Sequence, residues 1–142
     1  DVDDKTIKKS INEKISLNQL TRYYELKFFK DIEWLKMSKA SLYPRATDSI
    51  EKIIDIISSL LKKDYAYIED DGSVYFKISR FKDYGQLSKL VLEKKIMENK
   101  ILNDEYDEES AQDFALWKGY KKTDGAVCWN SPWGKGRPGW HI

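Results

Sequence analysis

The sequence is poor in the residues that form covalent or metal cross-links, with one cysteine and one histidine among 142 residues. No second Cys or His exists to complete a disulfide or a tetrahedral zinc site, so Cys128 and His141 form neither on their own. Cys128 is therefore interpreted as a small buried residue. The scarcity of cysteine fits a reducing compartment, and we expect a cytoplasmic protein.

Long apolar runs and a surplus of one charge are also missing. No stretch approaches the roughly 18 apolar residues of a membrane span, and no signal-peptide pattern opens the chain. Lys and Arg total 25 against 24 Asp and Glu, a net charge of +1, which argues against a dedicated nucleic-acid binder. Hydrophobic residues at 41% and charged residues at 35% indicate a globular domain, or part of one, with a packed core.

Glycine and proline are scarce until the last twelve residues, SPWGKGRPGWHI, which hold three of the seven glycines and two of the three prolines. Glycine lets a backbone approach a ligand closely, proline fixes its path, and tryptophan adds a planar wall. Residues 131–142 are therefore expected to form an ordered binding loop that leads to another strand.

Hydrophobic periodicity predicts two helices in the first half of the chain. Ser16 and Gln19 form a capping box at the start of the first helix, whose apolar residues recur at helical spacing as far as Leu35. Pro44 interrupts the pattern, and Thr47 is the expected N-cap of the second helix. One face of the second helix carries Ile50, Ile53, Ile54, Ile57, Leu60 and Leu61.

The second half of the chain mixes strands, a helix and loops. Residues 65–78 predict a hairpin with Asp71-Gly72 in a type I′ turn, and residues 113–121 predict a strand. Residues 87–102 predict a helix, and the acidic run 103–112 predicts a solvated loop.

The first residues, DVDDK, carry three aspartates in four positions and are expected at a strand-to-helix turn. Paired carboxylates can bind Mg²⁺ or act as acid and base. The more common role of such a cluster, Asp1, Asp3 and Asp4 beside Lys5, is to cap a helix and to pair with lysine, and we favour that interpretation.

Five motifs occur here in the same order as in cysteinyl-tRNA synthetases. They are DVDDK at 1–5, PRAT at 44–47, YG-x-LS at 84–88, DFALWK at 113–118 and SPWGKGRPGWHI at 131–142. Over its whole length the chain resembles an internal segment of such an enzyme.

The resemblance implies an α/β fold, namely part of a class I Rossmann-type catalytic domain with an inserted mixed α+β connective peptide. Residues 1–43 would belong to the first half of the catalytic domain and residues 44–137 to the connective peptide. Residues 138–142 would return into the catalytic domain.

The resemblance also implies a cysteine–tRNA ligase. Such an enzyme uses ATP with Mg²⁺ to make cysteinyl-adenylate and passes the cysteine to the 3′ end of tRNA(Cys). It would be a cytoplasmic monomer with no membrane partner, and a zinc ion would bind the substrate thiolate, because soft sulfur suits zinc.

Few of the site residues of that enzyme would lie in this chain. Trp140 and His141 would belong to the cysteine pocket, and Asp1 would lie near the active site. No catalytic residue and no metal ligand would fall within the segment, since the zinc-binding cysteine of the family would follow Ile142. The segment alone is therefore predicted to be inactive.

One further match is interpreted as coincidence. KMSKA at residues 36–40 resembles the ATP-binding Lys-Met-Ser-Lys-Ser loop of class I synthetases. That loop must be mobile, whereas here the letters are expected to close the first long helix, with no role toward ATP.

Two other functions compete with this interpretation. A related ligase joins cysteine to an amino-sugar inositol, but it typically lacks the lysine found here as Lys5 and has Phe in place of Trp133. A non-catalytic module that binds RNA or protein is the other alternative, and the near-neutral charge argues against it.

Overall fold

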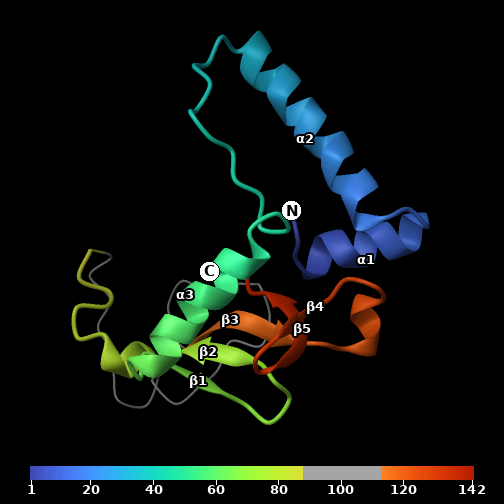
Figure 1. Cartoon of the computed structure of the whole chain (residues 1–142). Helices are drawn as coiled ribbons and strands as arrows, with labels where there is room; N and C mark the ends of the chain where they lie inside the picture. The colour runs from blue at the N-terminus through green and yellow to red at the C-terminus, as the bar shows by residue number, and fades with distance from the viewer. Residues whose placement is uncertain (88–112) are drawn as a thin grey trace.

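The computed structural model describes residues 1–87 and 113–142. The predicted helix beyond Leu87 and the predicted acidic loop therefore lie outside the described residues. The described part combines helices with a five-stranded antiparallel sheet in the order β1-β2-β3-β5-β4 (Figure 1). The fold is thus mixed α/β, as expected.

The elements have the following bounds. The α-helices are α1 (Asp4–Glu13), α2 (Leu17–Trp34) and α3 (Ile50–Lys62), and the 3₁₀ turns are η1 (Ile78–Arg80) and η2 (Lys122–Asp124). The strands are β1 (Ala66–Ile68), β2 (Val74–Phe76), β3 (Phe114–Gly119), β4 (Trp129–Ser131) and β5 (Gly134–Pro138). In Figure 1, α3 lies along the sheet, whereas α2 projects away from it and residues 35–46 lead back to α3.

Capping boxes set the starts of the first two helices. The Ser16 hydroxyl accepts the Gln19 amide at 3.1 Å, and the Gln19 side chain accepts the Ser16 amide at 2.9 Å, so the predicted box is confirmed. Asp3 and Thr6 form the same reciprocal pair at α1. One of the three N-terminal aspartates therefore caps a helix, as favoured above.

The helices end at left-handed residues that are not glycine. Lys14, Lys36 and Asp64 have φ angles of 54°, 53° and 59°. After α2, the Met37 amide donates to the Ile32 carbonyl at 3.1 Å, the bond of a Schellman motif, which satisfies a carbonyl at the helix end. The prediction that KMSKA is helical is therefore wrong, because the chain turns at Lys36 and residues 37–40 have no regular structure.

The core lies between α3 and the sheet. All six aliphatic residues predicted for one face of α3 pack in this cluster with Val74, Leu116 and Trp117, so the predicted face is confirmed. The N-cap of α3 is Ser49, and the expectation for Thr47 is wrong. Thr47 instead donates its hydroxyl to the Asp1 carboxylate at 2.5 Å, a contact 46 residues apart in sequence.

The predicted hairpin is confirmed, but its turn is of another type. Only Gly72 is left-handed, with φ 79°, and its amide donates to the Glu69 carbonyl at 2.9 Å. A type I′ turn would need positive φ at Asp71 as well, so this is a three-residue loop closed by a glycine. The predicted strand at 113–121 is confirmed as β3.

Half of the closing segment is strand, since Ser131 ends β4 and residues 134–138 form β5, whereas the other residues lie in turns and irregular structure. A Cβ at Gly136 would overlap the Trp117 indole and the Lys118 carbonyl, so only glycine fits at this point where β5 packs beside β3. Pro138 lies beyond the part of β5 that pairs with β4, because that pairing extends only as far as Gly136. Its missing N–H therefore interrupts no ladder on that side.

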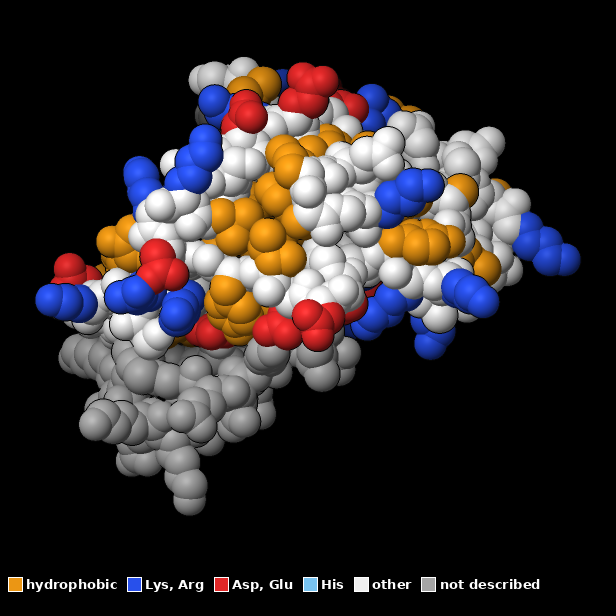
Figure 2. All heavy atoms as spheres, turned by 60° about the horizontal axis from the view of Figure 1, so that its bottom comes forward, with side chains coloured by type: hydrophobic (Ala, Val, Ile, Leu, Met, Phe, Trp, Pro, Cys, Tyr) orange, Lys and Arg blue, Asp and Glu red, His pale blue; other side chains and the backbone are white. Residues whose placement is uncertain are grey.

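The surface carries both signs of charge. On the face in Figure 2, Lys and Arg side chains are interspersed with Asp and Glu around a central group of hydrophobic side chains. That face therefore presents no field of a single sign. None of the helices in the described part is both long and apolar enough to cross a membrane.

Candidate functional site

The N-terminal residues contact the PRAT motif through charged side chains that are largely shielded from solvent. The Asp1 carboxylate lies 3.4 Å from the Arg45 Nε and accepts the Thr47 amide at 3.2 Å. The side chains of Asp1 and Arg45 are only 12% and 10% exposed, so solvent screens this pair weakly. Glu25 of α2 also lies 3.7 Å from the Arg45 Nε. The segment after α2 is thereby tied to the start of the chain.

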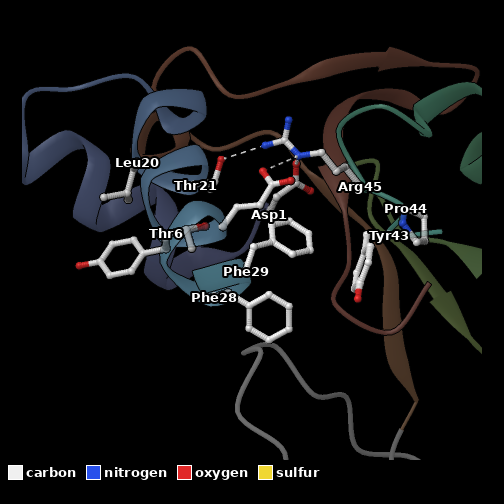
Figure 3. Close-up of a pocket in the computed structure, with 11 residues that line it drawn as sticks. Asp1, Thr6, Leu20, Thr21, Phe28, Phe29, Tyr43, Pro44 and Arg45 are labelled. Carbon is white, nitrogen blue, oxygen red and sulfur yellow. Dashed lines mark hydrogen bonds and ion pairs between the residues drawn. The ribbon is translucent and has the colours of Figure 1, made fainter. Parts of the chain in front are cut away.

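A cavity of about 430 Å³ borders this cluster. Figure 3 shows Arg45 directed toward Thr21 and Asp1, with the Phe28, Phe29 and Tyr43 rings forming the opposite wall. Phe29 and Tyr43 meet edge to face at 4.9 Å. The cavity thus has aromatic walls and one charged edge, which is a common pattern of a binding site for a small molecule or a side chain.

The same N-terminal segment reaches the last two motifs. Asp4 accepts a hydrogen bond from the Lys118 Nζ at 2.7 Å and pairs with the Arg137 guanidinium through its other oxygen. Lys118 and Arg137 face each other across β3 and β5. The Arg137 side chain is only 3% exposed, and Asp124 is its second ion-pair partner, at 3.7 Å.

Trp140 and His141 follow β5 after a single glycine, Gly139. Their rings meet at 5.1 Å, nearly perpendicular, and the His141 ring lies 5.3 Å from the Phe114 ring. Trp140 is 64% exposed and lies outside the core. The Asp1 hydrogen bonds and ion pairs go to Arg45 and Thr47, so the structure does not join Asp1 directly to the two C-terminal residues.

A zinc site cannot be assembled from the described residues. They contain no group of three or more His, Cys, Asp or Glu side chains placed to hold a metal ion. Cys128 is half-buried in the wall of a second cavity of about 470 Å³, beside Val127 and Trp129. The expectation that Cys128 is a buried residue is therefore met only in part.

Lys9, Lys27 and Tyr67 have clearly shifted pKa values. Hydrogen bonds to tyrosine hydroxyls raise the pKa of Lys9, through Tyr24, and of Lys27, through Tyr23. Burial raises the pKa of the Tyr67 hydroxyl, and the neighbouring Asp113 carboxylate raises it further. These groups lie on the helices and the sheet, and none of them is one of the predicted site residues.

The ion pairs of Arg45 and Arg137 with the N-terminal aspartates do not follow from any local sequence pattern. Both arginines belong to motifs that carried the resemblance, but their partners are 44 and 133 residues away. The only local signal was the run of aspartates, whose members turn out to have three different roles. Asp1 pairs with PRAT, Asp3 caps α1, and Asp4 joins β3 to β5.

Comparison with known proteins places the chain in a family. Residues 1–142 match the model of the tRNA synthetases class I (C) catalytic domain. The chain is 54% identical over 144 residues to a cysteine–tRNA ligase of Brachyspira hyodysenteriae and 46% identical over 143 residues to one of Chlamydia pneumoniae. A cysteine–tRNA ligase of Protochlamydia amoebophila is 45% identical over 145 residues.

Each of these matches covers 100% of this chain and 30% of the relative, so the chain spans about 30% of the length of the curated relatives it matches. Four of the five motifs that carried the resemblance are in contact. DVDDK pairs with PRAT through Asp1 and with DFALWK and SPWGKGRPGWHI through Asp4. Because the family model matches from the first residue to the last, this chain belongs to the family of class I (C) tRNA synthetase catalytic domains.

Proposed function

We propose that the chain is part of a cysteine–tRNA ligase. That enzyme activates cysteine with ATP and Mg²⁺ and transfers it to tRNA(Cys), acting as a cytoplasmic monomer. The observation that carries the proposal is the identity of 45–54% to proteins of that name, which extends over the entire chain. The ion pairs between four of the motifs also support it, because residues that carry the resemblance connect distant parts of the fold. Asp1 pairs with Arg45, and Asp4 pairs with Lys118 and Arg137.

The domain division proposed from the sequence stays the same. Residues 1–43 are assigned to the catalytic domain, residues 44–137 to the connective peptide, and residues 138–142 to the catalytic domain again. The antiparallel pairing of all described strands favours an inserted module at 44–137, because a Rossmann sheet is mainly parallel.

In this proposal Trp140 and His141 line the cysteine pocket, and Asp1 lies near the active site. The exposure of the Trp140 indole supports such a role, since an exposed ring beyond a strand end is free to contact a ligand. Zinc is assigned to the longer enzyme, where it would bind the substrate sulfur. The described residues do not form a site for it.

The acceptor of the cysteine separates the proposal from its closest rival. Full-length enzyme is supplied with ATP, labelled cysteine and either tRNA(Cys) transcript or an amino-sugar inositol. We expect label on the tRNA and none on the sugar. Label on the sugar alone would establish the rival ligase, and label on neither acceptor, with no adenylate formed, would favour a non-catalytic module.

A further inference from the structure

We propose that Asp4 is a positioning residue that holds the end of β5, and with it Trp140, in place for cysteine binding. This inference rests on the proposed function, because it takes Trp140 to be part of the cysteine pocket. Asp4 does not touch the substrate in this proposal. It acts through Arg137, which lies three residues before Trp140.

Arg137 is a buried charge that depends on Asp4. Its side chain is 3% exposed, and its Nε and Nη1 have no hydrogen-bond partner in the described structure. Asp124 lies 3.7 Å from Nε, too far for a hydrogen bond. The hydrogen bond from Nη2 to Asp4 is therefore the one side-chain hydrogen bond that this guanidinium makes within the described residues. Without the Asp4 charge, this buried cation would keep the Asp124 ion pair at 3.7 Å but no side-chain hydrogen bond within the described residues, which disfavours the present position of β5.

Asp4 is itself well anchored. It is the first residue of α1, directly after the Asp3 cap, where the helix dipole favours a negative charge. Its second oxygen accepts the Lys118 Nζ at 2.7 Å, and Lys118 faces Arg137 across the sheet. The Asp4 carboxylate thus pairs with two residues that face each other on β3 and β5, although Asp4 itself lies on α1.

The connection from Arg137 to Trp140 is short and stiff. Pro138 has a fixed φ, and the Gly139 amide donates to the Leu116 carbonyl at 2.8 Å. Trp140 is 64% exposed, and its described ring contact is with His141, the next residue. Since little else holds the indole, its position follows the backbone of β5. A shift of Arg137 would therefore reach Trp140.

A double-mutant cycle in the full-length enzyme tests this coupling. Asp4→Asn, Trp140→Ala and the double variant are compared by cysteine-dependent ATP–pyrophosphate exchange, with KM measured for cysteine and for ATP. The Asp4→Asn change keeps the side-chain shape and removes the charge that faces Arg137. We expect KM for cysteine to rise about 10-fold, which is the scale of one lost pocket contact. KM for ATP should stay within about twofold.

The decisive readout is additivity. If Asp4 acts through Trp140, kcat/KM of the double variant should be within about threefold of that of Trp140→Ala alone. Once the indole is removed, the Asp4→Asn change can no longer misplace it. Losses in kcat/KM that multiply would make Asp4 a purely structural residue and overturn the inference. Glu13→Gln is the matched control, since Glu13 is a carboxylate on the same helix that pairs with Lys9 at 3.7 Å and does not reach the sheet. It should leave both KM values unchanged.

Two outcomes keep the inference separate from the proposed function. If Trp140→Ala alone leaves cysteine kinetics intact, the proposed pocket is wrong and the inference falls with it. If Trp140→Ala impairs cysteine use while Asp4→Asn acts independently, only the inference fails. Should Asp4→Asn not yield folded enzyme, Arg137→Lys takes its place, because it keeps the charge and loses the planar fork. The same criterion of additivity then decides.

Discussion

Replacing Gly139 with alanine tests how closely the end of β5 packs against β3. Gly139 has no left-handed backbone, so the change brings no backbone strain, but its new Cβ would overlap the Ala115 carbonyl. Overpacking of this kind costs about 1–3 kcal/mol, and loss of the 2.8 Å bond from the Gly139 amide to Leu116 adds about 1 kcal/mol. The opening of β5 should therefore become easier by about 2–4 kcal/mol.

Hydrogen exchange followed by mass spectrometry measures that opening directly. A change of about 2–4 kcal/mol corresponds to amide exchange that is roughly 30- to 700-fold faster in peptides that cover β3 and β5. Lys135→Ala is the control, because Lys135 is an exposed residue of the same strand and its replacement leaves the backbone hydrogen bonds of β5 in place. Exchange in Gly139→Ala within threefold of the wild type would refute the packing argument.

Four further predictions concern other residues of the chain. Trp140→Ala should lower kcat/KM for cysteine by roughly 10–200-fold with little change in ATP affinity, whereas a loss of several degrees in melting temperature with intact cysteine kinetics would make Trp140 a packing residue. Lys36→Gly should stabilise the end of α2 by about 1 kcal/mol in urea unfolding, since glycine adopts positive φ freely. Lys36→Ala should leave KM for ATP within about twofold, and a 100-fold loss of kcat/KM, on the order of 2.7 kcal/mol, would make KMSKA a catalytic loop. Because the folded protein raises the pKa of Tyr67, the protonated hydroxyl stabilises the fold below about pH 10, and this stabilisation is lost at higher pH. Between pH 9 and pH 11 the urea midpoint of the wild type should therefore fall more than that of Tyr67→Phe. Equal falls would contradict the raised pKa of Tyr67.

The features that were predicted correctly depend on neighbours in sequence. The Ser16–Gln19 box and the aliphatic face of α3 each follow from residues three or four positions apart, which is the distance over which helix patterns act. The hairpin of β1 and β2 was found for the same reason. Its turn type was not, because Asp71-Gly72 fits two kinds of loop that differ only in the φ of Asp71.

The features that were missed depend on distant partners or on unusual backbone. Lys36 ends α2 in a conformation that glycine usually adopts, so no residue type marked the end of the helix. Gly136 and Pro138 favoured a loop locally, but they lie in a strand that pairs with β3, where the missing Gly136 side chain leaves room for the Trp117 indole. The pairing of Asp4 with Arg137 spans 133 positions, beyond the range of any local pattern.

The most direct test of the proposed function is cysteine-dependent ATP–pyrophosphate exchange by the full-length enzyme, with serine as the comparison. The proposal predicts exchange with cysteine and exchange that is at least roughly 100-fold weaker with serine, because a site built for sulfur rejects a hydroxyl. Absence of exchange with cysteine, or equal exchange with both amino acids, would contradict the assignment of this chain to a cysteine–tRNA ligase.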